Sequence, residues 1–211
     1  MLTKFYRSKL VLVIEVLALT IFPLILLKNF PEWLIYRHWV MLGGLVYVFL
    51  FVWSQRPGWK NLGFQSANFI QAVAVLIRPT LLAILCLIIL YKLLPTSYVL
   101  PLGIAGVKIS PIIISVFRYI FISAPLQEIL YRSYLINRAG LVIKNQLFIR
   151  AYATMIFILI HTPFKTPVLT LGSLILGWIW TGHFLKFRNI YSLIFSHILI
   201  GATYIILMGL S

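Results

Sequence analysis

Long apolar stretches, separated by short connections that carry basic residues or proline, run through the whole chain of 211 residues. A helix needs about 20 mainly apolar residues to cross roughly 30 Å of hydrocarbon, and seven stretches approach or exceed that length. They cover residues 10–27, 38–54, 70–94, 111–137, 147–162, 167–185 and 190–209. The pattern predicts an all-α protein, a polytopic transmembrane helix bundle of about seven spans, or eight if the third or fourth stretch is split.

The composition excludes an ordinary soluble domain. Hydrophobic residues make up 62% of the chain and charged residues only 10%, against roughly 45–50% and about 25% in soluble domains. The net charge of +15 would suggest nucleic acid as a partner of a soluble protein. Here the basic residues punctuate the apolar stretches, so we expect contact with the lipid bilayer and its anionic headgroups, and no nucleic acid.

The lysines and arginines also predict an orientation. A cytoplasmic N-terminus places ten of them in connections on the cytoplasmic side and five on the opposite side, as the positive-inside rule prefers. The first stretch follows Lys4, Arg7 and Lys9, like a signal peptide, but it is too long for one and carries Glu15, so we interpret it as a retained span. Short connections and the absence of an internal repeat favour a single membrane-embedded domain over residues 1–211.

Two of the three acidic residues, Glu15 and Glu128, lie within apolar stretches. A buried carboxylate is costly, so each needs a partner or a cavity. Arg132 follows Glu128 by four positions and shares its helix face, so a purely structural ion pair is one interpretation. Glu15 has no basic residue at helical spacing within its stretch, and we interpret it as a bundle-packing or near-interface group. Pro125 predicts that the fourth helix kinks or begins anew beside Glu128.

His161 and His197 lie in two later stretches. Either histidine alone is more often a hydrogen-bonded core residue, but two of them beside a span that carries Glu128 favour a chemical site. His38 and His183 lie near the ends of stretches, and we assign them to the membrane interface.

Three motifs occur in order along the C-terminal half: Gln127-Glu-Ile-Leu-Tyr-Arg132, the Phe157 to His161 unit, and the segment from Gly177 to His197. They resemble the CPBP family, which comprises the type II CAAX prenyl endopeptidases and the bacteriocin-processing and self-immunity intramembrane proteases. The family pattern is two adjacent glutamates with an arginine four positions after the second, then Phe-x-x-x-His, then a histidine followed four positions later by asparagine or a similar residue. The resemblance covers about residues 110–210.

The resemblance implies an intramembrane endopeptidase of a bacterial plasma membrane that acts on a peptide or a membrane-associated protein. A carboxylate in an apolar cavity can activate water, and nearby histidines can orient that water or stabilise the oxyanion. The implied catalytic residues are Glu128, His161, His197 and Gln127, with Arg132 and Phe157 in support. No cofactor and no obligatory metal is predicted, because the histidines lack a tight ligand spacing; a histidine-bound divalent ion stays an alternative.

Two positions depart from the family pattern. Gln127 stands where the first glutamate would act as the base, and an amide cannot accept a proton from water. Glu128 points about 100° away from it on a helix and already faces Arg132. Gly201 stands in place of the asparagine and offers no side-chain donor.

These departures leave a second function open: a catalytically inactive protein of the same fold that serves as a binding, immunity or regulatory partner. A small transporter is disfavoured, because the chain shows neither paired broken helices nor an internal repeat. The substrate, the cleavage position and the oligomeric state are open at this point.

Overall fold

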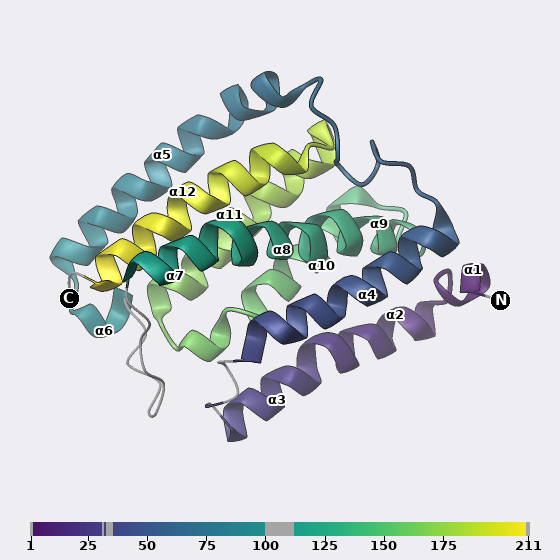
Figure 1. The fold of residues 1–211 in the computed structure, drawn as a ribbon, viewed down its shortest axis with the longest axis horizontal. Coiled ribbons are helices and arrows are strands. Elements are labelled where there is room, and N and C mark those ends of the chain that lie inside the picture. The colour runs from purple at the N-terminus through teal and green to yellow at the C-terminus, as the bar shows by residue number, and fades with distance from the viewer. Residues whose placement is uncertain (1, 31, 33–35, 100–111, 210–211) are drawn as a thin grey trace.

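The computed structural model describes residues 2–30, 32, 36–99 and 112–209, and within these ranges the chain forms helices and no strand (Figure 1). The all-α prediction is confirmed. The N-terminal part comprises α1 (Leu2–Phe5), α2 (Lys9–Val16), the π-helical turn η1 (Leu17–Ile21), α3 (Phe22–Asn29), α4 (Arg37–Gln55), α5 (Phe69–Leu93) and α6 (Thr96–Val99). The C-terminal part comprises α7 (Ile112–Arg118), the π-helical turn η3 (Tyr119–Ser123), α8 (Ala124–Glu128), the π-helical turn η4 (Ile129–Tyr134), α9 (Leu135–Gly140), α10 (Gln146–Leu159), the 3₁₀ turn η5 (Thr162–Phe164), α11 (Pro167–Phe187) and α12 (Ile190–Gly209).

Five described helices are long and apolar enough to cross a membrane: Phe69–Leu93, Ile112–Gly140, Gln146–Phe164, Pro167–Phe187 and Ile190–Leu207. They correspond to the last five predicted stretches, of which residue 111 lies outside the described ranges. The first two stretches are helical as well, in α2 to α3 and in α4. Within their described residues, Leu42–Gln55 forms an apolar helix, but one that is shorter than a full span. The count of seven spans is therefore not confirmed.

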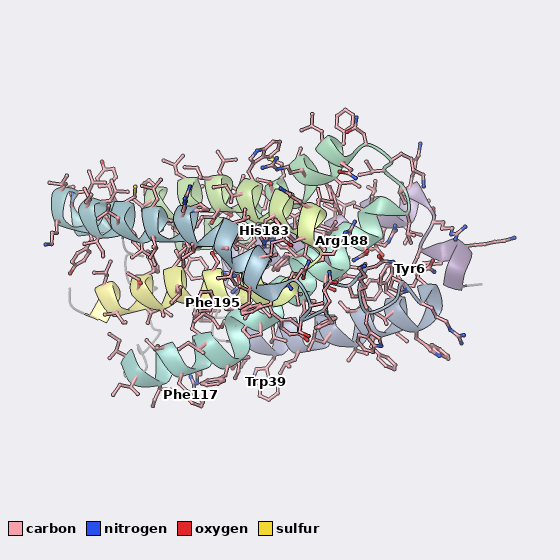
Figure 2. All side chains as sticks on the ribbon, turned by 90° about the horizontal axis from the view of Figure 1, so that it is seen from above. Tyr6, Trp39, Phe117, His183, Arg188 and Phe195 are labelled. Atoms are coloured by element: carbon pink, nitrogen blue, oxygen red, sulfur yellow. The ribbon has the colours of Figure 1, made fainter. Side chains whose placement is uncertain are left out.

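Large apolar side chains cover the outside of the molecule. Trp39, Phe117 and Phe195 are exposed, and Figure 2 shows Trp39 and Phe117 pointing away from the helices. A protein in water would bury such residues, whereas lipid tails solvate them at no cost. Together with the five apolar helices, this surface identifies an integral membrane protein.

The helices pack around α12. This helix lies beside α5 on one side and beside α7 and α8 on the other, and α10 and α11 pair with each other (Figure 1). The main buried core includes Phe157 from α10, Trp180 and Phe184 from α11, and Leu193 from α12. The rings of Phe157 and Trp180 also contact the ring of His197 on α12.

The helix from Ile112 to Gly140 is continuous but irregular. The wide turns η3 and η4 stand immediately before and after α8, which carries Pro125 and Glu128. Ser123, just before α8, keeps helical backbone angles (φ −64°, ψ −53°), so the helix does not begin anew at the proline. Proline cannot donate to the preceding turn and crowds it, and a π-helical turn accommodates this defect while redirecting the side chains that follow.

Glu15 pairs with a residue far away in sequence. Its Oε2 lies 2.8 Å from Nε of Arg138 in α9, and both side chains are buried. The hydroxyl groups of Tyr47 and Tyr134 also donate to Glu15. The interpretation of Glu15 as a bundle-packing group agrees with these contacts, which attach α2 to α9 and α4.

Candidate active site

Glu128 is completely buried and contacts two other polar side chains. Its Oε1 accepts a hydrogen bond of 2.7 Å from Nδ1 of His197. Its Oε2 lies 3.5 Å from Nε of Arg132, one turn further along the same helix. The carboxylate therefore lies between a guanidinium and an imidazole, so the predicted Glu128–Arg132 pair forms and is not isolated.

The hydrogen bond to Glu128 determines the hydrogen position on His197. A carboxylate only accepts, so Nδ1 of His197 carries the hydrogen and Nε2 holds the lone pair when the ring is neutral. The ring is 5% exposed and stacks obliquely on Trp180, with 4.6 Å between the centroids. His197 is thus held in one orientation with one basic nitrogen available.

His161 is oriented in the same way by the backbone. It follows α10, and its Nδ1 donates to the carbonyl of Phe157 at 2.7 Å, because that oxygen can only accept. Its Nε2 is therefore also the lone-pair nitrogen in the neutral ring. The Phe157 ring lies 4.5 Å from the His161 ring and 6.0 Å from the His197 ring, so it joins the two histidines.

Arg132 is 1% exposed and held by rings. Its guanidinium carbon lies 3.9 Å from the centre of the Phe157 ring and 5.5 Å from that of Trp180. Its three nitrogens make no hydrogen bond to the described residues. Its positive charge is therefore compensated by the Glu128 carboxylate and by the aromatic faces.

Trp180 and Gly177 of α11 complete the walls of the site, and neither was assigned such a role from the sequence. Trp180 is buried, and its indole N–H donates to Ser196 Oγ at 3.0 Å, immediately before His197. A Cβ on Gly177 would lie 3.2 Å from Phe157 Cδ1, so the glycine lets α11 approach the ring. The signal available was the position of both residues within the segment Gly177 to His197.

The two positions that depart from the family pattern differ in their surroundings. Gln127 is half-buried on α8, and it is Glu128, not Gln127, that reaches His197. Gly201 lies one turn after His197, where a Cβ would overlap the ring and hydroxyl of Tyr119. An asparagine therefore cannot replace Gly201 while Tyr119 keeps its place.

Of the remaining histidines, His183 stays outside the site. His183 lies one turn before the end of α11, as predicted, but its ring is buried and pairs with Ser192 Oγ at 3.1 Å. The side chain of His38 lies outside the described residues. Among the described residues, no three histidine, cysteine, aspartate or glutamate side chains form a group that could hold a metal ion. The absence of an obligatory metal stays a prediction.

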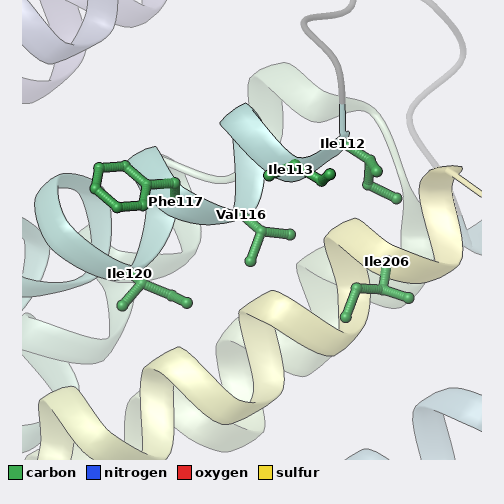
Figure 3. Close-up of a pocket in the computed structure, with 6 residues that line it drawn as sticks. All are labelled: Ile112, Ile113, Val116, Phe117, Ile120 and Ile206. Carbon is green, nitrogen blue, oxygen red and sulfur yellow. The ribbon is translucent and has the colours of Figure 1, made fainter.

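An apolar pocket of about 430 Å³ opens on the seam between α7 and α12 (Figure 3). Its walls are Ile112, Ile113, Val116, Phe117, Ile120 and Ile206. Ile120 follows Tyr119 directly, so the pocket and the buried polar residues lie along the same seam. A pocket of this composition can hold hydrocarbon and carries no chemistry of its own.

The three motifs follow one another along the chain, and side chains from all three converge on one buried cluster. Residues 108–203 match the family Type II CAAX prenyl endopeptidase Rce1-like. The predicted resemblance is confirmed, and the matched Rce1-like segment contains all seven motif positions from Gln127 to Gly201. The helices α1 to α6 lie before it. The searches of curated proteins and of solved structures gave no match.

Proposed function

We propose that this protein is an intramembrane endopeptidase that hydrolyses a peptide bond in a membrane-associated protein or peptide. The observation that carries the proposal is the buried hydrogen bond between Glu128 and His197, with His161 joined to the same cluster through Phe157. An oriented imidazole backed by a carboxylate is a recurrent arrangement for taking a proton from a nucleophile.

In this proposal the Glu128–His197 pair replaces the base that Gln127 cannot supply. Arg132 and the His197 N–H both face Glu128, so its negative charge is compensated and the carboxylate itself is a weak proton acceptor. The same carboxylate stabilises His197 when that ring is protonated. His197 Nε2 therefore removes the proton as the water oxygen attacks the peptide carbonyl, and it returns the proton to the leaving amine.

His161 and Gln127 orient the water. His161 presents a lone pair at Nε2, which accepts one hydrogen of the water. The Gln127 amide offers both a donor and an acceptor beside Glu128, which suits positioning rather than proton transfer. Arg132 holds Glu128 and packs on Phe157, and the Phe157 ring keeps His161 and His197 in place.

The substrate proposed is membrane-associated. The cluster lies between apolar helices, and the pocket on the α7–α12 seam presents only hydrocarbon walls. A substrate segment that carries a lipid, or one with an apolar sequence, can reach the cluster along these apolar walls. The family description names CAAX prenyl endopeptidases, so C-terminal prenyl-peptides are one class to test beside unmodified peptides.

Gln127 favours a second candidate: a non-catalytic protein with the same site architecture that binds a membrane partner. In that case the cluster recognises a peptide and no bond is broken. The two candidates differ in one measurable outcome, which is whether purified protein releases a cleaved product.

The test is proteolysis of a peptide and prenyl-peptide panel by purified protein in liposomes, followed by mass spectrometry of the products. Wild type is compared with His197→Ala, His161→Ala, Glu128→Gln and Gln127→Glu, with His183→Ala as the matched histidine outside the site. Cleavage by wild type and His183→Ala that disappears in the other two histidine variants supports the peptidase. No cleavage by wild type, combined with cleavage by Gln127→Glu, supports the binding protein.

A further inference from the structure

Tyr119 begins the wide turn η3, nine positions before Glu128. In a regular α-helix nine residues turn through about 900°, which would put the two side chains on opposite faces. Both nevertheless meet α12: Glu128 bonds to His197, and the Tyr119 ring meets the His197 ring edge-on with centroids 5.8 Å apart. The π-helical turn η3 rotates less per residue than an α-helix and so brings the two side chains closer to one face.

The hydroxyl end of Tyr119 lies directly against the backbone of Gly201. A Cβ placed on this glycine would overlap the hydroxyl oxygen, Cζ and Cε1 of Tyr119. Gly201 is one turn after His197 and therefore on the same face of α12. The phenol thus fills the space into which any side chain at position 201 would project.

Tyr119 also belongs to the electrostatic surroundings of the site. Its half-buried ring packs edge-on against His197, and His197 in turn donates to the Glu128 carboxylate. A phenol hydroxyl, like the NH₂ group of a carboxamide, donates a hydrogen bond without carrying a charge. Gly201 has no side-chain donor, but the Tyr119 hydroxyl from η3 lies directly beside it and can donate in its place.

We propose that the Tyr119 hydroxyl donates a hydrogen bond to the substrate carbonyl oxygen and stabilises the oxyanion formed when water attacks. This inference rests on the proposed peptidase function. No proton is transferred: the tyrosine keeps its hydrogen while negative charge develops on the substrate oxygen, and it keeps that hydrogen when the amine leaves. Gly201 is the residue that makes room for this donor.

The test separates the hydroxyl from the ring. Tyr119→Phe keeps the packing on Gly201 and His197 and removes only the donor, so kcat should fall by about 10²–10³-fold with KM and Tm little changed. Tyr152→Phe is the matched control, because its hydroxyl has no hydrogen-bond partner among the described residues and lies in α10. The double variant Tyr119→Ala/Gly201→Asn moves the donor to position 201 and should regain activity relative to Tyr119→Ala.

The assay is run with wild type, or with Gln127→Glu if only that protein cleaves the panel. Cleavage that is equally fast in Tyr119→Phe, while His197→Ala is inactive, overturns the role of Tyr119 and leaves the peptidase function standing. Failure of both wild type and Gln127→Glu to cleave any substrate overturns the peptidase function and this inference with it. A fall in kcat confined to Tyr119→Phe, absent in Tyr152→Phe, supports the hydroxyl as the oxyanion donor.

Discussion

Glu128 Oε1 and His197 Nδ1, 69 positions apart in the sequence, are joined by a hydrogen bond of 2.7 Å in the interior of the helix bundle. This contact links the irregular helix that carries the first motif to the helix that carries the last. It also determines which nitrogen of His197 is basic. The relationship is therefore both a packing contact and the proposed centre of the chemistry.

Replacing His197 by alanine should lower kcat by about 10²–10⁴-fold, the usual contribution of a positioned general base. The Glu128–Arg132 pair survives in this variant, so the fold should persist. Rates are measured under single-turnover conditions in liposomes, with His183→Ala as control. Equal rates in His197→Ala and wild type would contradict the assignment of the base.

Removing the charge of Glu128 should destabilise the protein more than removing the whole ion pair. Glu128→Leu leaves the buried Arg132 uncompensated, at a cost of about 3–5 kcal/mol. The double variant Glu128→Leu/Arg132→Met removes both charges and should regain most of that stability while it stays inactive. Thermal unfolding in detergent measures the difference, and a double variant no more stable than the single one would show that the pair is not the cause.

The second buried pair, Glu15 with Arg138, should affect stability without affecting chemistry. Arg138→Met leaves the Glu15 carboxylate with two tyrosine hydroxyls as donors, and we expect a loss of about 3–5 kcal/mol. Below its lowered transition temperature, the variant should keep the wild-type kcat. A loss of kcat in a still folded protein would mean that the N-terminal helices act on the site directly.

Gly201→Ala should be destabilising because the new methyl group overlaps Tyr119. Overpacking of this kind costs about 1–3 kcal/mol. The additional substitution Tyr119→Ala removes the overlap and should recover much of the loss. A double-mutant cycle on thermal stability measures this coupling, and additive effects of the two substitutions would contradict direct contact.

Much of the fold was predictable because a span needs a long apolar segment and a helix satisfies its own backbone. The last five apolar stretches correspond to helices able to cross a membrane, and the spacing of Glu128 and Arg132 predicted their pairing on one helix face. Both are local properties, since they depend on residues close together in the chain.

The ordered motifs also indicated which side chains belong together. Glu128, His161 and His197 were selected because ionisable groups inside apolar stretches are costly, and the structure joins them through Phe157. Pro125 indicated an irregular helix beside Glu128, although the chain absorbs the proline in wide turns without interrupting the helix.

Tertiary structure alone decided the remaining relationships. Glu15 looked unpaired because its partner, Arg138, is 123 positions away. Gly201 looked like a lost donor until the packing of α12 against η3 placed Tyr119 over it. The sequence determined the apolar segments, the buried charges and their order, because their cost in lipid is a property of each segment. Which helices pack side by side depends on complementary side-chain shapes across the bundle. The packing in turn decides which buried group compensates or replaces another, and this became visible only in three dimensions.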